Sequence, residues 1–262
     1  MKIVVLVKYV PDIEIGYEFT GQNTLDRSGA GLLSQLDEHP LEEARQLAEA
    51  LDDVEVIALT LGPDDADEAV RRALQMGADA AFHVSDPAVA GSDAGATALV
   101  LAKAITHIGD VDLILTGAES ADSGTRLVPV KLAALLGIPA LTGASSLAVQ
   151  PGGGAVTIER DEDAATLTLS APLPALVSVT DKANEPAYPS AKAVMLARRK
   201  PVDELDLADL GVDASLVGAG AARVAVGSVT PNPPRAGGRK IPADGPDAIG
   251  QFIGLLREAG LV

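Results

Sequence analysis

Short apolar runs rich in β-branched residues alternate with amphipathic segments over the first 140 residues, and this alternation constrains the fold more than any other feature. The apolar runs are Ile3–Val7, Val54–Leu61, Ala80–Val84 and Val111–Thr116. Their shortness and continuous hydrophobicity are typical of parallel strands buried on both faces. Between them, apolar residues recur at helical spacing over 40–51, 64–75 and 93–105. Strands alternating with helices predict a doubly wound parallel sheet with right-handed crossovers.

The pattern changes after Leu141. Three segments alternate apolar and polar residues as antiparallel strands do, and Ala175–Thr180 follows them as another strand of this kind; the three are Ser145–Val149, Val156–Arg160 and Thr166–Ser170. Residues 227–246 are rich in Pro and Gly, which is typical of an extended arm. An amphipathic helix is expected over Pro246–Ala259. Its apolar side needs a covering surface, and both its own domain and a partner subunit remain open as that surface.

The composition excludes several kinds of chemistry. The chain has no Cys, and its three His are scattered, so no thiolate or histidine metal centre is expected. A net charge of −17 and an aromatic content of 2% argue against nucleic acid as a partner. No apolar run is long enough to cross a membrane, and the N-terminus does not resemble a signal peptide. We therefore expect a cytoplasmic protein without direct membrane insertion.

The loop after the fourth predicted strand is the best candidate ligand site. Open α/β sheets bind ligands at the carboxyl ends of strands where the strand order reverses. Here Asp122-Ser123-Gly124-Thr125 precedes a helix expected to start near Thr125 or Arg126. Hydroxyl groups, free amides and a close backbone approach at Gly124 would suit a phosphate. An ordinary helix cap explains the same string, so both interpretations remain open. No Walker motif, nucleophile elbow or nucleophile–base pair is found.

Eight segments together carry a family resemblance. They are Ile3–Asp12, Asp37–Ala44, Gly62-Pro63, Ala73–Asp79, Gly117–Val128, Pro174–Val179, Asn184-Glu185-Pro186 and Arg198-Arg199-Lys200. In this order and spacing the chain resembles the β subunit of electron transfer flavoprotein, close to the form found in actinobacteria. The resemblance implies a doubly wound, adenine-nucleotide-binding (HUP/USP-like) α/β fold with an antiparallel hairpin extension and a C-terminal arm. It places a nucleotide-binding domain at 1–183, and the docking loop, arm and terminal helix at 184–262.

The resemblance also implies cofactors. An α subunit would hold most of a redox-active FAD, while this chain would bind AMP and shield that flavin. The implied nucleotide contacts are Leu6, Val7, Lys8, Ser34, Gln35, Leu36, Asp37, Leu61, Gly62, Gly117, Ala121, Asp122, Ser123, Gly124, Thr125, Arg126, Leu127 and Val128. Ile13 and Leu36 occupy positions that approach the flavin. Ser34-Gln35 stands where many members have Asn-Pro, a departure that bears on nucleotide choice.

Partners follow from the same resemblance. Electrons would come from acyl-CoA dehydrogenases and other flavin dehydrogenases, as in fatty acid oxidation, and pass to a membrane quinone oxidoreductase. The family's docking loop corresponds to about Ala187–Leu196, and its usual large apolar anchor aligns with Ala191. Docking is therefore expected to rest on Val194, Met195 or Leu196.

These implications make the chain an electron carrier subunit rather than a self-sufficient enzyme. Two alternatives remain. One is an electron-bifurcating β subunit with its own FAD. The other is a stand-alone, adenine-nucleotide-binding protein of the stress-response type, which would explain residues 1–140 but not the hairpin region or the arm.

Overall fold

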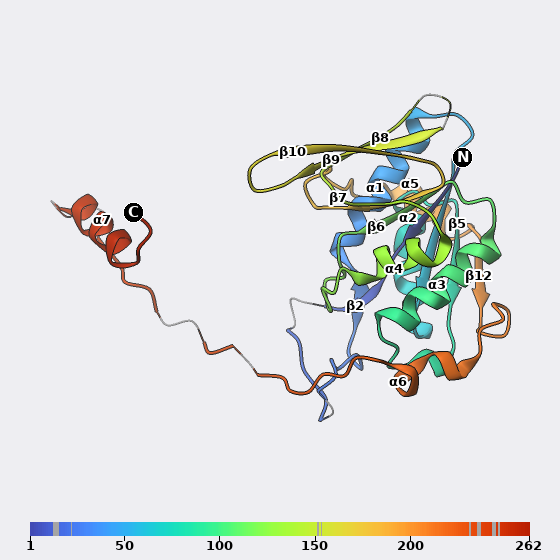
Figure 1. The fold of residues 1–262 in the computed structure, drawn as a ribbon, viewed down its shortest axis with the longest axis horizontal. Helices are drawn as coiled ribbons and strands as arrows, with labels where there is room; N and C mark the ends of the chain where they lie inside the picture. Colours follow the sequence, from blue (N-terminus) through green and yellow to red (C-terminus); the bar gives the residue numbers. More distant parts are fainter. Residues whose placement is uncertain are drawn as a thin grey trace. The chain divides into compact units, whose positions relative to one another are not determined.

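The computed structural model describes residues 1–12, 16–21, 23–150, 152, 154–230, 232–234, 237–242, 245 and 247–262. The chain divides into two compact units, Met1–Gly227 and Ser228–Val262. Each is described by itself (Figure 1).

Seven parallel strands form the central sheet of the first unit, in the order β12-β5-β4-β1-β6-β11-β7. Their bounds are β1 (Lys2–Leu6), β4 (Glu55–Leu61), β5 (Ala80–Val84), β6 (Leu113–Gly117), β7 (Ala140–Ala144), β11 (Ala175–Val179) and β12 (Val202–Leu205). From β1 the chain moves outward to β4 and β5, then returns to place β6 on the other side of β1. The predicted doubly wound parallel sheet is confirmed, and its strand order reverses between β1 and β6.

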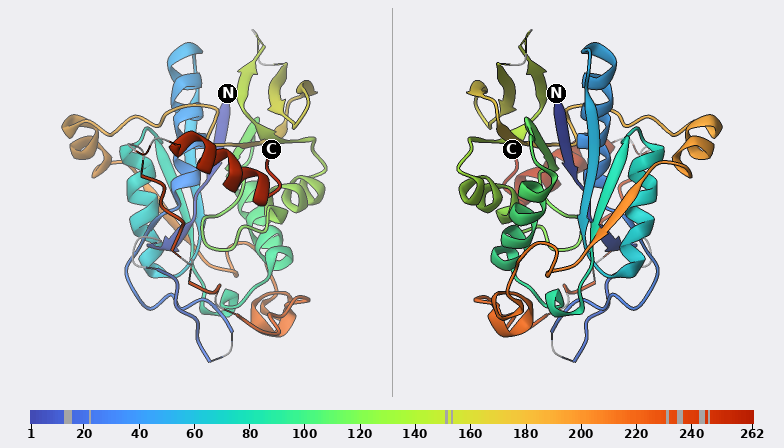
Figure 2. Two further views of the ribbon diagram at one scale, coloured as in Figure 1. Left: turned by 90° about the vertical axis from the view of Figure 1, so that its left-hand side faces the viewer. Right: turned by 90° about the vertical axis from the view of Figure 1, so that its right-hand side faces the viewer.

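Helices cover both faces of this sheet. Figure 2 shows α1 (Gln35–Ala50) and α2 (Asp67–Gln75) on one side, in blue and cyan, and α3 (Ala94–Ile108) and α4 (Leu127–Leu136) on the other, in green. Alternate residues of β1 enter the two cores. Ile3 and Val5 pack with α1 and α2, whereas Val4 and Leu6 pack with α3 and α4. Burial on both faces explains why this strand is apolar throughout.

The predicted antiparallel extension is present as a separate sheet of order β10-β9-β8. It comprises β8 (Ser146–Val149), β9 (Ala155–Asp161) and β10 (Thr166–Pro172). The assignment of Ala175–Thr180 to this antiparallel set is wrong. That segment forms β11, which pairs in parallel with both β6 and β7. All five β11 residues are buried, as a central strand requires.

A short antiparallel ribbon follows β1. It pairs β2 (Tyr9–Pro11) with β3 (Gly31–Leu33) and leads directly into α1. Helix α1 begins five residues before the predicted start at Pro40, which lies within its second turn. Pro40 has no amide hydrogen to donate to the Leu36 carbonyl oxygen, so one intrahelical hydrogen bond is missing there.

The first unit extends to Gly227 and includes the segment after Asn184. It contains α5 (Ala191–Ala197), the edge strand β12 paired in parallel with β5, and α6 (Gly218–Ala221). The described part of the unit also contains the short 3₁₀ helices η1 (Asp64–Ala66), η2 (Pro87–Val89) and η3 (Ala214–Leu216). Sequence periodicity missed β12 because it has only four residues, of which two are acidic.

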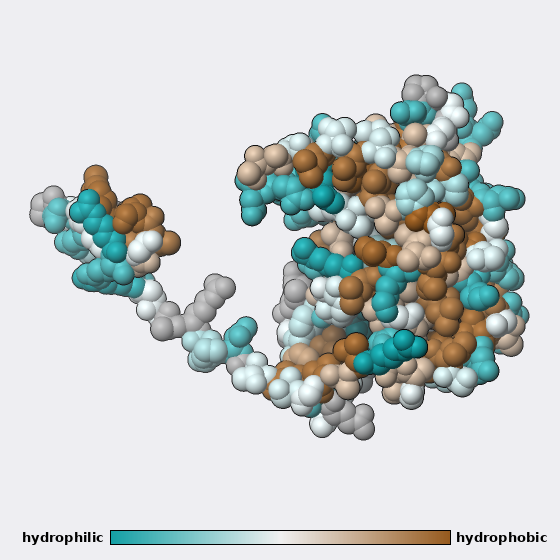
Figure 3. Space-filling model, viewed as in Figure 1, coloured by the Kyte–Doolittle hydropathy of each residue, from teal (hydrophilic) through white to brown (hydrophobic). Residues whose placement is uncertain are grey.

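In the described residues of the second unit there is one helix, α7 (Ala248–Glu258). Pro246, the expected first residue, lies outside the described residues. Figure 3 shows hydrophobic side chains gathered on one side of this helix. They include Ile249, Phe252 and Ile253, which are 77%, 56% and 39% exposed. Among the described residues, none of the helices has both the length and the hydropathy needed to cross a bilayer.

Candidate functional site

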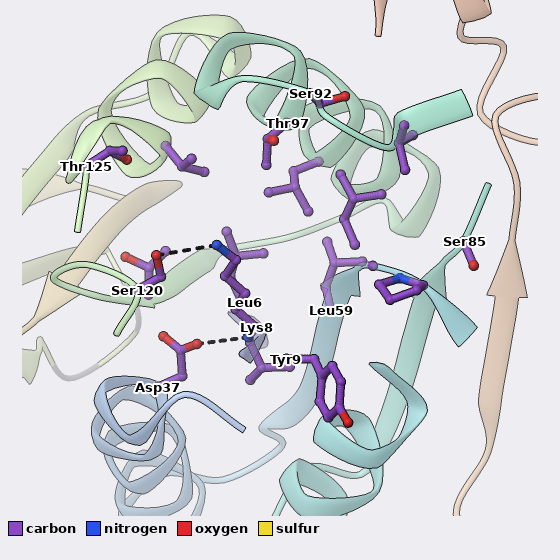
Figure 4. Close-up of a pocket in the computed structure, with 18 of the residues that line it drawn as sticks. Leu6, Lys8, Tyr9, Asp37, Leu59, Ser85, Ser92, Thr97, Ser120 and Thr125 are labelled. Atoms are coloured by element: carbon purple, nitrogen blue, oxygen red, sulfur yellow. Dashed lines mark hydrogen bonds between the residues drawn. The ribbon is translucent and has the colours of Figure 1, made fainter. Parts of the chain in front are cut away.

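A cavity of about 650 Å³ opens at the carboxyl ends of β1, β4, β5 and β6 (Figure 4). Its position coincides with the reversal of strand order between β1 and β6, where doubly wound sheets bind ligands. Its volume lies within the usual range for small-molecule sites. One wall is apolar and is formed by Leu6, Leu59, Val89, Leu101 and Val128. Such a wall suits a flat, largely apolar ring.

The loop from β6 to α4 forms the polar end of this cavity. Gly117 packs so closely against the start of α1 that an added Cβ atom would lie 2.6 Å from Asp37 Oδ1 and 2.9 Å from the Leu36 carbonyl oxygen. Gly124 and Arg126 both adopt left-handed backbone conformations just before α4. The helix begins at Leu127 with Pro129 in its first turn, close to the predicted start. Free amides at a helix start favour an anionic ligand.

Two cations meet at one buried carboxylate in this loop. Lys8 Nζ lies 2.9 and 3.0 Å from the two Asp122 carboxylate oxygens, and Arg27 donates to the same group. The Asp122 side chain is fully buried. Burial alone would raise its pKa, but Lys8 and Arg27 outweigh that effect and hold the pKa well below its usual value. Burial also lowers the pKa of the Lys8 amine, which Asp122 opposes.

Hydroxyl groups surround the same cation. Lys8 Nζ lies 3.5 Å from Ser120 Oγ and 3.3 Å from Ser123 Oγ, and these two oxygens are 2.7 Å apart. The Tyr17 hydroxyl donates to the Ala121 carbonyl oxygen at 2.8 Å, a further contact that holds the loop between β6 and α4 in place.

A second ion pair lies at the cavity entrance. Arg126 donates from Nε to Glu119 Oε2 at 2.7 Å and from Nη2 to Glu119 Oε1 at 3.2 Å. This hydrogen bond lowers the pKa of Glu119. Lys8, Arg27 and Arg126 therefore each pair with a carboxylate, and an incoming phosphate would compete with Asp122 and Glu119 for them.

Asp37 is a buried acid in the cavity wall. Figure 4 shows its carboxylate pointing from α1 toward Lys8, whose backbone amide donates to Asp37 Oδ2 at 2.9 Å. Burial raises the Asp37 pKa to about 7, while the backbone amides of Lys8 and Gly117 act in the opposite direction. Near neutral pH this group is able both to accept a ligand hydrogen bond and, when protonated, to donate one.

The turn after β4 lines the opposite end of the cavity with Gly62, Pro63 and Asp64. Behind this turn, His83 is buried in β5. Its Nε2 lies 3.3 and 3.1 Å from the carbonyl oxygens of Gly62 and Pro63, so Nε2 carries the proton and holds this turn in place. Beside it, Ser85 Oγ donates to Asp64 Oδ1 at 3.1 Å.

The predicted nucleotide contacts fall into three groups. The cavity is lined by Leu6, Val7, Lys8, Asp37, Leu61, Gly62, Gly117, Thr125, Arg126 and Val128. A smaller cavity of about 290 Å³ is lined by Gln35, Leu36, Ala121 and Gly124. The remaining four, Ser34, Asp122, Ser123 and Leu127, line neither cavity. Ser34 is buried and its Oγ accepts from the Ala121 amide at 3.4 Å, whereas Ser123 and Leu127 are exposed.

Two residues, Leu36 and Ile13, are predicted to face the flavin. Leu36 lines the smaller cavity together with Val10, Pro11 and Leu32. Ile13 lies outside the described residues. Glu119 and Ser120 line both cavities, so one stretch of the loop separates the two.

Several lining residues were not predicted from the sequence. The clearest is Arg27, which reaches Asp122 across 95 residues of sequence from an irregular loop without any motif. Ser85, Ser92 and Thr97 also line the cavity. The approach of the β5 end to β4 could have indicated Ser85, because neighbouring parallel strands end at one edge of the sheet.

The predicted docking residues lie on α5. Met195 and Leu196 are 71% and 50% exposed, Ala191 is exposed, and Val194 is half-buried. Tyr188, just before the helix, was not predicted and is 90% exposed.

Comparisons with known proteins agree on one family. The model for the electron transfer flavoprotein domain matches residues 22–210. Electron transfer flavoprotein subunit beta of Mycobacterium leprae is 42% identical over 259 residues, covering 96% of this chain and 97% of the relative. The protein of that name from Megasphaera elsdenii is 33% identical over 95% of each chain. The caffeyl-CoA reductase-Etf complex subunit CarD of Acetobacterium woodii is 29% identical over the full length of both.

Proposed function

The chain belongs to the electron transfer flavoprotein family as a β subunit, and from this premise we propose that it binds AMP in the larger cavity and shields an FAD held mostly by an α subunit. Subunits of this kind transfer electrons and are not self-sufficient enzymes. The observation that carries the proposal is the cavity at the β1–β6 reversal, with an apolar wall on one side and a loop of hydroxyls and cations on the other.

The residues present fit an adenine nucleotide. The apolar wall of Leu59, Val89 and Leu101 suits a purine ring. Ser120, Thr125 and the amides at the start of α4 suit a phosphate monoester, with Lys8 and Arg126 supplying positive charge. Asp37 offers a hydrogen-bonding group between the two ends.

The smaller cavity supports the flavin part of the proposal. Leu36, Leu32, Val10 and Pro11 give it an apolar lining that suits one side of an isoalloxazine ring brought by another chain. FAD supplies the one- and two-electron chemistry when it is bound. The residues of this chain position that ring and exclude water from it.

We further propose that α5 docks electron-donating flavin dehydrogenases, acyl-CoA dehydrogenases among them, and that a membrane quinone oxidoreductase accepts the electrons in the cytoplasm. The exposure of Met195 and Leu196 supports a docking role for this helix. Ala191 at the expected anchor position presents only a methyl group.

Cofactor counting on the co-purified complex tests the proposal. The chain is co-expressed with an α subunit of the family, the complex is isolated, and its nucleotides are extracted and quantified. One FAD and one AMP per heterodimer is the expected result. Two FAD molecules would instead identify the electron-bifurcating form. A flavin-free monomer that binds ATP would identify the stand-alone nucleotide-binding alternative and overturn the proposal.

A further inference from the structure

A hydrogen-bonded clamp joins the middle of α1 to the chain just before α5. Asn184 Nδ2 donates to the His39 carbonyl oxygen at 3.0 Å and to Glu43 Oε1 at 2.8 Å. His39 Nδ1 lies 3.2 Å from both the carbonyl oxygen and the side-chain oxygen of Asn184. The two sequence motifs around His39 and Asn184, separated by 145 residues, are thus two halves of one structure.

Two buried carboxylates of α1 accept the hydrogen bonds of this clamp. Glu42 and Glu43 are only 4% and 6% exposed. Arg45 and Gln46 of the same helix satisfy Glu42, which also accepts from the Ala187 amide at 3.4 Å. Burial raises the pKa of Glu43, and the hydrogen bond from Asn184 opposes that shift. Withdrawing a donor from a buried carboxylate is unfavourable, so the clamp holds the chain at 184–187 in one place.

Tyr188, which directly follows the clamped segment 184–187, makes a further contact with α2. The Arg72 guanidinium of α2 lies 5.1 Å from the centre of the Tyr188 ring, and Arg72 also pairs with Glu38 of α1 at 3.2 Å. The Tyr188 side chain is nevertheless 90% exposed. Figure 2 shows α5, in light orange, at the edge of the first unit beyond α2.

The surface beyond the clamp is apolar with a basic rim. Tyr188, Met195 and Leu196 are its apolar members. Lys192, Arg198 and Arg199 are exposed around them, in a chain whose net charge is −17. We call these six residues the α5 surface. Its charge complements a partner whose apolar recess is bordered by carboxylates.

We propose that Asn184 is a positioning residue for electron-donor docking: through Glu43 and His39 it fixes the α5 surface, and Tyr188 replaces the missing anchor at Ala191. The proposal rests on the proposed function, because it takes the occupant of the α5 surface to be a flavin dehydrogenase. The physical reason is pre-organisation. Helix α5 has seven residues, too few to be stable alone, and ordering it during binding would weaken the complex.

The test measures reduction of the heterodimer by an acyl-CoA dehydrogenase supplied with its acyl-CoA substrate. Asn184→Ala and Tyr188→Ala are each expected to raise the KM for the heterodimer about tenfold, the size of a typical anchor or clamp loss, with kcat unchanged. Flavin content and reduction by dithionite stay at wild-type values, which separates docking from damage to the flavin site. Asp181→Ala, at an exposed position upstream of the clamp, is the matched control and keeps the wild-type KM.

A second pair of variants keeps the test valid if Asn184→Ala folds poorly. Glu43→Gln retains an oxygen that accepts from Asn184 Nδ2, whereas Glu43→Ala removes it. We expect Gln to preserve the KM and Ala to raise it. Hydrogen exchange of the amides at 187–197 should be faster in Glu43→Ala and in Asn184→Ala, and unchanged in Glu43→Gln.

The results distinguish two failures. The double variant Met195→Ala/Leu196→Ala reports on docking itself. If it raises the KM while the clamp variants do not, the positioning role is overturned and docking at α5 stands. If it leaves the KM unchanged as well, docking at α5 is wrong, and the proposed function loses that part while AMP and FAD binding remain separately measurable.

Discussion

Asp122 joins three distant parts of the chain at the polar end of the larger cavity. Its carboxylate receives Lys8 from the end of β1 and Arg27 from the loop before β3, and the loop from β6 carries it. Removing it leaves two half-exposed cations side by side. We expect Asp122→Ala to lower the free energy of unfolding by about 1–3 kcal/mol, below the value for a fully buried pair because water reaches both cations.

Chemical denaturation of the purified chain at fixed nucleotide concentration measures this loss. Asp161→Ala removes a carboxylate whose nearest cation, Lys182, is 3.7 Å away on the exposed hairpin sheet, and serves as the control. Its effect should stay within about 0.5 kcal/mol. Equal losses from the two variants would contradict the role given to Asp122.

Asp37 predicts a pH dependence of stability. Its pKa is about 7 in the folded chain against a usual value of 3.8, so the folded state holds a proton that the unfolded state has released. Stability contributed by this group is present below pH 3.8 and is lost as the pH rises toward about 7. The maximum slope for one proton is about 1.4 kcal/mol per pH unit.

Asp37→Asn removes this titration. Between pH 4.5 and 6.5 the free energy of unfolding of the wild type should fall with pH more steeply than that of the variant. The difference between the two slopes should correspond to about one proton. Comparing slopes excludes any constant effect of the amide on stability. Parallel curves from denaturation midpoints across that range would show that Asp37 titrates normally.

At the scale of elements, the contact of β6 with the start of α1 fixes the geometry of the site. Only a glycine fits at position 117, because a Cβ atom there would meet Asp37 and Leu36 at 2.6 and 2.9 Å. Gly117→Ala is expected to push α1 away and to destabilise the chain by about 1–3 kcal/mol, with a loss of bound nucleotide.

Nucleotide content after extraction and denaturation midpoints measure the two effects. Gly29→Ala is the matched control, since no atom lies within 4 Å of its added Cβ. If Gly117→Ala retained nucleotide at wild-type occupancy, the cavity would not depend on this contact.

Some strands of the central sheet could be predicted from the sequence and others could not. The runs that became β1, β4 and β5 were predicted almost to the residue, because a strand buried on both faces must be apolar throughout. Strand β11 was placed in the wrong sheet, since a local pattern carries no information about which strands it will join. Arg27 and Asn184 were beyond prediction for a related reason: their partners lie 95 and 141–145 residues away.

At the scale of the whole molecule, the exposed apolar residues of the second unit indicate a role in assembly. Helix α7 exposes Ile249, Phe252 and Ile253, and it begins after a Pro- and Gly-rich stretch. We propose that this arm covers part of the α subunit. Removing residues 228–262 should then leave the first unit folded and reduce its affinity for the α subunit.

Circular dichroism of the truncated chain and titration with the α subunit test both halves of this prediction. Phe252→Ser is expected to weaken assembly about tenfold or more, and Gln251→Ser, at an exposed neighbouring position, should leave it unchanged. A truncated chain that loses thermal stability but assembles normally would instead place the arm on its own domain.

The position of β11 also limits the order in which the strands can pair during synthesis. Within the described part of the sheet β7 pairs with β11 alone, and β11 is synthesised after the whole β8–β10 sheet. Until β11 leaves the exit tunnel, β6 has an unpaired edge and β7 has no place in the sheet. Open edges of this kind attract other chains. The antiparallel sheet forms from strands that are neighbours in the sequence, so it is able to fold in that interval, before β11 joins β6 to β7.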